Sequence, residues 1–368
     1  MNGTMRGFGR RVAGVLLLVV ATIVVLPVAV VCAVFTALTS PWHLRVGRLR
    51  RVVAVAAVYS ATEIVGLVLA AGRWVRFVVG GDAGRDRRSR VRSLTSSLTA
   101  LRGAARRYGR LEVNLVSPSD QDPDSLALPA GPLIVCGRHG GVGGAFLLAQ
   151  ILLADYSRLP RVVLKQTLSW DPLIDTLLSR IPHAFIDPHP GDQGATAARI
   201  GVLAQHMDPD DALLIFPEGG NFSPRRRMHA IRRLRRRGLT KAAAHAEQLQ
   251  HVMPPHPDGL FAAIEAAPEA DVLFVAHTGL EHVQSAADMW RALPLRLPVV
   301  FTWWTVPASE IPHEEEARVA WLEENWSRID RWVAASRGTG SLGAGDQGTG
   351  DQDTEDQGTG TLGAGSHA

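Results

Sequence analysis

Short apolar runs alternate with segments of helical pattern over most of the chain. Mainly apolar runs of three or four residues, typical of buried strands, occupy positions 133–136, 161–164, 184–186, 213–216, 272–275 and 299–302. Helical patterns occupy positions 145–154, 172–180 and 195–205. Strands that alternate with helices predict a layered α/β domain with a mostly parallel central sheet. In such sheets, ligands bind beyond the carboxyl ends of the strands.

Two basic segments also have helical patterns. Residues 89–108 place Leu94 and Leu98 on one apolar face, and residues 225–241 hold nine Lys or Arg side chains. In the second segment Met228, Ile231 and Leu234 recur at a spacing of three. Two interpretations remain open for it, contact with anionic lipid headgroups and a solvated helix face.

The N-terminal part has a different pattern. Residues 12–44 contain no Asp, Glu, Lys or Arg, and 52–72 contain only Glu63 as a charge. The first run exceeds the roughly 20 residues that span a bilayer. It is too long for the apolar region of a signal peptide, and it lacks a cleavage site. We therefore expect a helical membrane hairpin. Arginines flank both runs on every side, which favours a hairpin that dips into one leaflet over two full crossings.

Composition separates the C-terminal end from the rest. From Ser336 the chain is rich in Gly, Thr, Asp and Gln, which predicts disorder. The expected organisation is a membrane-anchoring hairpin over 1–80, an α/β domain over 81–335 and an acidic tail over 336–368. The whole chain has a net charge of +4, and without the five acids of the tail this becomes +9. A basic body suits an anionic membrane surface or anionic substrates.

Cys32 and Cys136 indicate no disulfide framework. Charge alone would also allow nucleic-acid binding, but no nucleic-acid-binding motif or interleaving of aromatic residues accompanies it, so we expect no nucleic-acid partner. Trp303 and Trp304 are expected to be core or interfacial aromatics.

The first candidate motif follows the strand at 133–136. It reads Cys-Gly-Arg-His-Gly-Gly-Val-Gly-Gly over residues 136–144. His139 is a candidate general base, because neutral imidazole accepts a hydroxyl proton near pH 7. A structural histidine in a tight turn is the alternative when this block is considered alone.

The second candidate motif follows the strand at 213–216. It reads Phe-Pro-Glu-Gly-Gly-Asn-Phe-Ser-Pro over residues 216–224. The strand delivers Glu218 to the sheet edge, and Gly219 and Gly220 allow close backbone approach. A surface turn is the alternative for this block considered alone.

Together the two blocks resemble the glycerolipid (lysophospholipid) acyltransferase family, which has a His-x4-Asp box and a Phe-Pro-Glu-Gly box. The likeness, of the 1-acylglycerol-3-phosphate acyltransferase type, extends over about residues 130–332. Residues 221–224, 252–259, 307–312 and 321–330 look like the lysocardiolipin and lysophosphatidylinositol branch. Lys165 and Phe185-Ile186-Asp187 are similar to the second box of the family.

The resemblance implies that His139 deprotonates an acceptor hydroxyl, which then attacks an acyl thioester of coenzyme A or acyl carrier protein. Glu218 would hold the acceptor, and the glycine loop would face the developing oxyanion. Gly219, Arg138, Lys165 and Asn221 are the further substrate-binding candidates. No cofactor or metal is implied. The expected partners are a lysophospholipid and the bilayer, with the catalytic domain on the cytoplasmic face of the cell membrane.

Three positions depart from the pattern of the family. Gly144 stands where the family has Asp, with Asp171 and Asp175 as candidates to replace this acid. Asn221 and Pro188 stand where relatives have arginines that contact substrate phosphate, which favours a larger headgroup, or a phosphate held by Arg138 or by Arg225 to Arg227.

Gly144 also motivates a second hypothesis, a lipid-binding or scaffold protein without turnover. That hypothesis predicts that Gly144→Asp would create or greatly raise activity. A hydrolase is the third alternative, although the chain lacks a Gly-x-Ser-x-Gly elbow.

Overall fold

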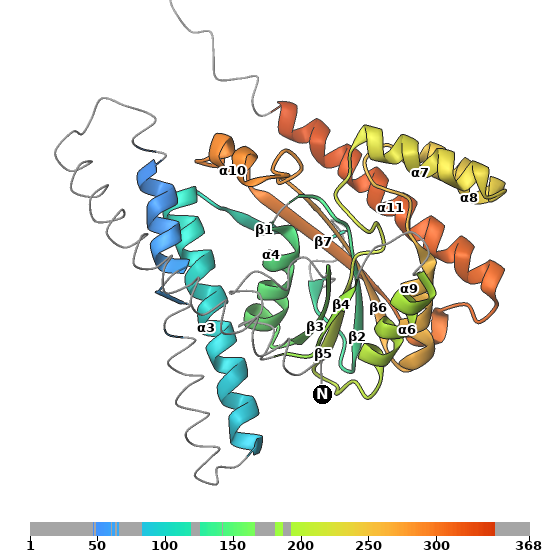
Figure 1. Cartoon of the computed structure of the whole chain (residues 1–368), viewed down its shortest axis with the longest axis horizontal. Coiled ribbons are helices and arrows are strands. Elements are labelled where there is room, and N and C mark those ends of the chain that lie inside the picture. The colour runs from blue at the N-terminus through green and yellow to red at the C-terminus, as the bar shows by residue number, and fades with distance from the viewer. Residues whose placement is uncertain are drawn as a thin grey trace, which may run out of the picture.

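A central sheet with helices on both faces forms the body of the protein in the computed structural model (Figure 1). The structure describes residues 47, 49–59, 61–62, 65, 83–118, 126–141, 143–165, 181–186 and 193–342. Among these residues the sheet has seven strands in the order β1-β7-β6-β2-β5-β3-β4. Their bounds are β1 Val113–Leu115, β2 Leu133–Gly137, β3 Leu159–Lys165, β4 His183–Ile186, β5 Asp211–Ile215, β6 Asp271–Thr278 and β7 Val299–Val306.

The strands pair in parallel, with the exception of the antiparallel pair β6 and β7. This confirms the predicted α/β class and the mostly parallel sheet. All six predicted strands are present, most of them extended by one to four residues. The three-residue strand β1 had no recognisable pattern because so short a run carries no periodicity.

The described helices comprise α3 Ala83–Gly109, α4 Gly144–Gln150, α6 Gln193–Ala204, α7 Pro224–Arg236, α8 Thr240–Gln248, α9 Pro257–Ala266, α10 Ala286–Ala292 and α11 Glu315–Leu342. A π-helical turn, Ile151–Asp155, continues α4, and a short 3-10 turn covers Ala308–Glu310. The predicted helices at 89–108, 145–154 and 195–205 correspond to α3, to α4 with its extension and to α6. The helix expected at 172–180 lies outside the described residues.

Alternate residues of the central strands supply two separate cores. On one face Ile134 and Cys136 of β2 pack into a cluster with residues of α6, α9 and α11. On the other face Leu133 and Val135 pack with residues of α4 and its extension. Because both faces are covered, these strands read as continuous apolar runs rather than as alternating ones. Trp303 and Trp304 are both buried, one in each core, as expected.

The ends of the chain are described only in part. Leu94 and Leu98 of α3 are buried against the π-helical turn and β3, which confirms the apolar face of this basic helix. The apolar run 12–44 and most of 52–72 lie outside the described residues. No helix within the described part of the chain is long and apolar enough to span a bilayer. Helix α11 continues to Leu342, so the segment from Ser336 to this point is helical rather than disordered as predicted; residues 343–368 lie outside the described part.

A buried carboxylate of helix α11 holds the chain between α8 and α9. Asp330 accepts hydrogen bonds from the backbone N–H groups of Gln250, His251 and Val252, at 2.6 to 3.1 Å. Trp326, one turn earlier, donates its indole N–H to the carbonyl of Met253 at 2.9 Å. The chain between α8 and α9 is therefore held by a helix that lies some 70 residues later in the sequence.

We expect Asp330→Ala to lower the free energy of unfolding by about 3 kcal/mol, because it leaves three inward-facing N–H groups without their acceptor. Urea unfolding followed by circular dichroism measures this loss. Glu324→Ala is the matched control, since Glu324 lies on the same helix in an exposed pair with Arg331 and should cost no more than about 1 kcal/mol. Equal losses in the two variants would contradict this role of Asp330.

Candidate active site

The strand register brings the two sequence motifs together. Cys136 of β2 pairs with Ile215 of β5, and His139 and Glu218 each follow three residues later. Both therefore lie beyond the carboxyl ends of adjacent parallel strands, where ligands bind in such sheets. The backbone N–H of His139 faces the Glu218 carboxyl group. The two motifs thus meet at one edge of the sheet.

Close backbone packing explains the glycines around His139. At Gly141, with φ of 107°, an added Cβ would lie 2.0 Å from the carbonyl oxygen of Leu280. At Gly137 it would lie 2.8 Å from the Phe216 ring. Both positions therefore require glycine for space, and Gly141 requires it for its backbone conformation as well.

The half-buried His139 side chain lies beside Phe216, with ring centroids 5.2 Å apart and a tilt of 47°. Asn221 connects the two motifs, because its Oδ1 accepts a hydrogen bond from the N–H of Gly141 at 3.2 Å. Gly219, with φ of 65°, forms a turn in which its N–H donates to the carbonyl of Phe216 at 3.1 Å. Asn221 therefore positions the glycine loop in addition to lying at the site.

Glu218 is buried, with 4% of its surface exposed. Burial raises its pKa to about 8, although Arg138 and the backbone N–H groups of His139 and Met253 act in the opposite direction. Neither carboxyl oxygen has a hydrogen-bond partner of normal geometry among the described residues. At neutral pH the group is mostly protonated, and it carries unused hydrogen-bonding capacity.

Arg138 lies beneath the site rather than at its surface. Its side chain is fully buried, and it forms an ion pair with Glu281 at 2.8 Å. The same guanidinium donates to the carbonyl of His251 at 3.1 Å and to that of His277. Although burial acts in the opposite direction, the Arg138 ion pair lowers the pKa of Glu281. Arg138 was expected to meet substrate phosphate, and the structure instead gives its guanidinium protein partners.

His277 is a site residue that the sequence analysis missed. Gly137 of β2 pairs with Val275 of β6, so His277 lies level with His139. Strand β6 flanks β2 on the side away from β5. The His277 side chain is 1% exposed, and its Nε2 lies 3.2 Å from the carbonyl oxygen of Arg138. Burial, followed by the charge of Arg138, lowers its pKa to about 3, which keeps the imidazole neutral. The only sequence signal was a histidine just after the apolar run at 272–275.

Lys165 ends β3, which pairs with β5. It therefore belongs to the same edge of the sheet as Glu218. Arg226, at the start of α7, is exposed, and its Nη1 donates to the carbonyl of Asn221 at 3.2 Å. Arg226, one of the residues expected near phosphate, thus borders the Glu218 motif in the open.

Residues 121–275 match the family model described as Acyltransferase. No match was found among curated proteins or among solved structures. The chain contains an acyltransferase-family domain. The matched segment includes His139 and Glu218 and ends in β6, two residues before His277.

The acyltransferase domain lacks a motif carboxylate after its histidine. Gly144 begins α4, and the Asp171, Asp175 and Pro188 positions lie outside the described residues. The space beside Gly144 is filled by the His277 ring, since a Cβ on Gly144 would lie 2.6 Å from Cε1 and 2.7 Å from Nε2. The expectation that Gly144→Asp alone raises activity therefore conflicts with the packing of this residue.

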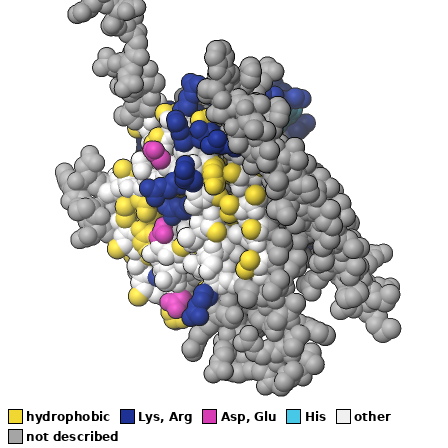
Figure 2. All heavy atoms as spheres, turned by 90° about the vertical axis from the view of Figure 1, so that its left-hand side faces the viewer, with side chains coloured by type: hydrophobic (Ala, Val, Ile, Leu, Met, Phe, Trp, Pro, Cys, Tyr) yellow, Lys and Arg dark blue, Asp and Glu magenta, His cyan; other side chains and the backbone are white. Residues whose placement is uncertain are grey.

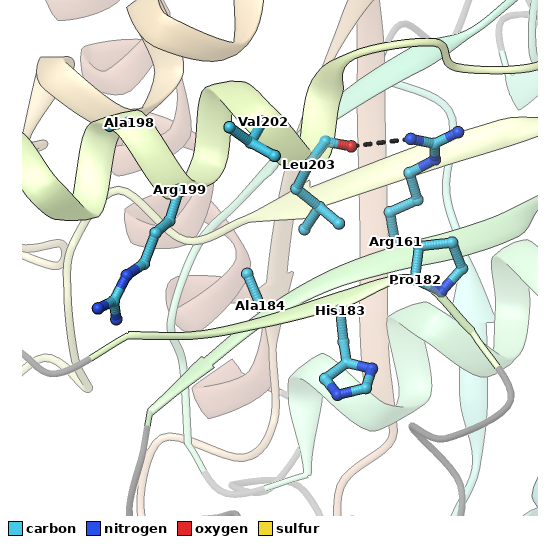
Figure 3. A pocket seen from close by; sticks show the side chains of 8 residues that line it. All are labelled: Arg161, Pro182, His183, Ala184, Ala198, Arg199, Val202 and Leu203. Atoms are coloured by element: carbon cyan, nitrogen blue, oxygen red, sulfur yellow. Dashed lines mark hydrogen bonds between the residues drawn. The ribbon is translucent and has the colours of Figure 1, made fainter. Parts of the chain in front are cut away.

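An open cavity of about 530 Å³ lies between α6 and the beginning of β4 in the acyltransferase domain. Figure 3 shows Arg161 and Arg199 bordering it, with Arg161 bonded to the carbonyl of Leu203 at 2.9 Å. It lies away from His139 and Glu218, so we do not assign it to the site. The described part of the chain has no cluster of His, Cys, Asp or Glu side chains suited to a metal ion.

The raised pKa of Glu218 predicts a pH-dependent effect on stability. Between its ordinary pKa of 4.5 and about 8, the folded protein holds a proton here that the unfolded chain releases, so this residue makes the fold less stable as pH rises. Glu218→Gln should match wild type near pH 5 and exceed it above pH 8 by up to about 5 kcal/mol. Urea unfolding at both pH values measures the difference, with exposed Glu269→Gln as the control. A difference that is independent of pH would contradict the buried protonated state.

Proposed function

We propose that the protein transfers a fatty acyl group from an acyl thioester to the hydroxyl group of a lysophospholipid. The observation that carries this proposal is the register that places His139 and Glu218 side by side in an acyltransferase-family domain. The donor is the thioester of coenzyme A or of acyl carrier protein, and the acceptor is of the 1-acylglycerol-3-phosphate type or has a larger headgroup. The proposed reaction uses no bound cofactor, since the acyl thioester is a co-substrate.

His139 acts as the general base in this mechanism. Its imidazole takes the proton of the acceptor hydroxyl while the oxygen forms a bond to the thioester carbonyl carbon. The carbon–sulfur bond then breaks, and the thiolate takes the proton from the imidazolium. The products are the acylated lipid and the free thiol. The glycine loop after His139 faces the developing oxyanion.

Glu218 is the proposed ligand of the acceptor. Two buried carboxyl oxygens without partners are costly, and the acceptor hydroxyls would satisfy them. A mostly protonated carboxyl group can both accept and donate a hydrogen bond, and it does not oppose an anionic phosphate nearby. The enclosure of Glu218 implies that the acceptor reaches it through movement of the surrounding loops.

The membrane is the proposed source of the acceptor. Figure 2 shows the side of the molecule on which α3 lies, where Lys and Arg side chains gather among hydrophobic ones. Arg92, Arg106 and Arg107 of α3 are exposed. Such a surface suits anionic headgroups at the cytoplasmic face. The apolar hairpin predicted for residues 1–80 would hold the domain there.

His139→Ala should reduce acyl transfer by about 10²–10⁴-fold, because the acceptor hydroxyl loses its base. Purified full-length protein in mixed micelles, labelled acyl-CoA or acyl carrier protein and a panel of lysophospholipids provide the assay. His313→Ala, which changes an exposed histidine before α11, is the control and should keep full activity. Unchanged transfer by His139→Ala would exclude this mechanism.

The second candidate is a lipid-binding protein of the same fold without turnover, which the missing acid at Gly144 favours. The two candidates differ in the same assay. The second one predicts that wild type binds acyl-CoA or lysolipid but forms no product. Acyl release to water in the absence of an acceptor would indicate hydrolysis instead.

Arg226 should contribute to acceptor binding, because its exposed guanidinium borders the Glu218 motif. We expect Arg226→Ala to raise KM for the lysophospholipid by about 10-fold with little change in kcat, the effect of losing one charge-assisted contact. Arg236→Ala, at the far end of α7, is the matched control. Equal effects of the two substitutions would indicate only a general charge contribution.

A further inference from the structure

The absent motif acid and the buried His277 occupy one and the same place in the fold. Gly144 begins α4, and His277 lies on β6, well over a hundred residues later. A Cβ on Gly144 would lie 2.6 Å from Cε1 of the His277 ring, closer than such atoms approach in proteins. A Cβ on Gly140 would lie 2.9 Å from the same atom. The ring thus fills the volume into which a side chain at position 144 would project.

The environment of His277 fixes which ring nitrogen carries the proton. Nε2 lies 3.2 Å from the backbone carbonyl of Arg138, which can only accept, so Nε2 is the donor. In the neutral ring Nδ1 is then an acceptor. This atom is buried and has no hydrogen-bond partner among the described residues. A buried acceptor without a partner is rare enough to need an explanation.

The position of the ring supplies that explanation. Extending the pairing of Gly137 with Val275 places His277 level with His139. Phe301 stacks against the His277 ring at 5.1 Å and holds it in place from β7. The two histidines interact electrostatically. A hydrogen-bond acceptor that comes within reach of the general base plays the part that the motif carboxylate has in a histidine dyad.

We propose that His277 is the positioning residue of His139, and that its Nδ1 takes the place of the carboxylate that the chain lacks at Gly144. This inference rests on the proposed acyl transfer. In this pairing a ring N–H of His139 would turn to donate to Nδ1 of His277, a hydrogen bond that the present structure does not contain, and the other nitrogen of His139 would then be directed at the acceptor hydroxyl. Gly144 is then required, because any side chain there would displace the positioning ring.

The charged groups described around this pair come from several elements, and they include Arg337 of α11, which lies 3.6 Å from Glu281, and Asp330 of α11, whose charge acts on Glu218. Arg138 and Glu281 face His277 from the β2 loop and from the loop after β6, and they form an ion pair. Glu218 faces the backbone of His139 from the β5 side. A neutral imidazole stabilises a protonated His139 less than a carboxylate would. The acid limb of the pH–rate profile should therefore lie lower in wild type than in a variant that carries the acid.

The first experiment tests the shared space and needs no activity. Gly144→Ala should lower Tm by about 5 °C through overpacking, whereas the same change in a His277→Ala background should have little effect. Gly103→Ala is the control, because a Cβ at this helical glycine meets nothing within 4 Å. Additive effects of Gly144→Ala and His277→Ala would overturn the shared-space argument.

The second experiment separates the two nitrogens of His277. Asparagine places a polar atom where Nδ1 stands, and glutamine places one where Nε2 stands. We expect His277→Asn to keep kcat within a few-fold of wild type and its pH profile, and His277→Gln to lose about 10-fold or more in kcat with KM unchanged. Equal losses, no loss in either variant, or a larger loss in His277→Asn would overturn the role of Nδ1.

The third experiment restores the family arrangement. Gly144→Asp with His277→Ala should recover the activity lost in His277→Ala and move the acid limb of the pH–rate profile upward. Gly144→Asp alone should be destabilised. If wild type shows no transfer, the proposed function fails, while NMR titration of the His139 ring still tests this inference: the midpoint should change in His277→Gln and not in His277→Asn. An unchanged midpoint in both variants would overturn it.

Discussion

The ion pair between the fully buried Arg138 and the partly buried Glu281 holds the parts of the site together. Arg138 directly precedes His139, and its guanidinium also binds the carbonyls of His251 and His277. A buried charge is tolerated only when it is paired, so these partners cannot separate without a large loss of stability. The loop after β2, the end of β6 and the chain between α8 and α9 are therefore held together by one side chain. Asp330 fixes the last of these segments from α11.

Two titratable groups that are neutral near pH 7, Glu218 and His277, lie on either side of His139. Burial favours the protonated form of Glu218 on the β5 side and the deprotonated form of His277 on the β6 side. Both groups are thus uncharged near pH 7, the carboxyl group because it keeps its proton and the imidazole because it has released one. The physical cause is the same for both, the desolvation of the charged form. An acidic dyad partner would have brought a net negative charge to this place. The chain instead pairs Glu281, the carboxylate that acts on His277, with Arg138 beneath the site.

Much of the fold was predictable from the sequence because it follows from periodicity and burial. The six apolar runs correspond to strands, since a strand covered on both faces is apolar throughout. The meeting of His139 and Glu218 was predictable for a related reason, as parallel strands end at one edge of the sheet. The three-residue β1, the helical continuation of α11 to Leu342 and the interior position of Arg138 were not, because each depends on contacts with distant parts of the chain.

The α/β class, the two motifs and the acyltransferase-family match of residues 121–275 all follow from the amino-acid sequence. It also showed that position 144 lacks an acid, but it could not show what lies there instead. The fold answers that question, because the residue that fills the space, His277, comes from β6 and is brought to Gly144 by strand pairing. Side chains that compete for one volume leave no local pattern, since the contact joins residues far apart along the chain. For the same reason the burial of Arg138 could not be predicted, since the partners of its guanidinium all lie more than a hundred residues later.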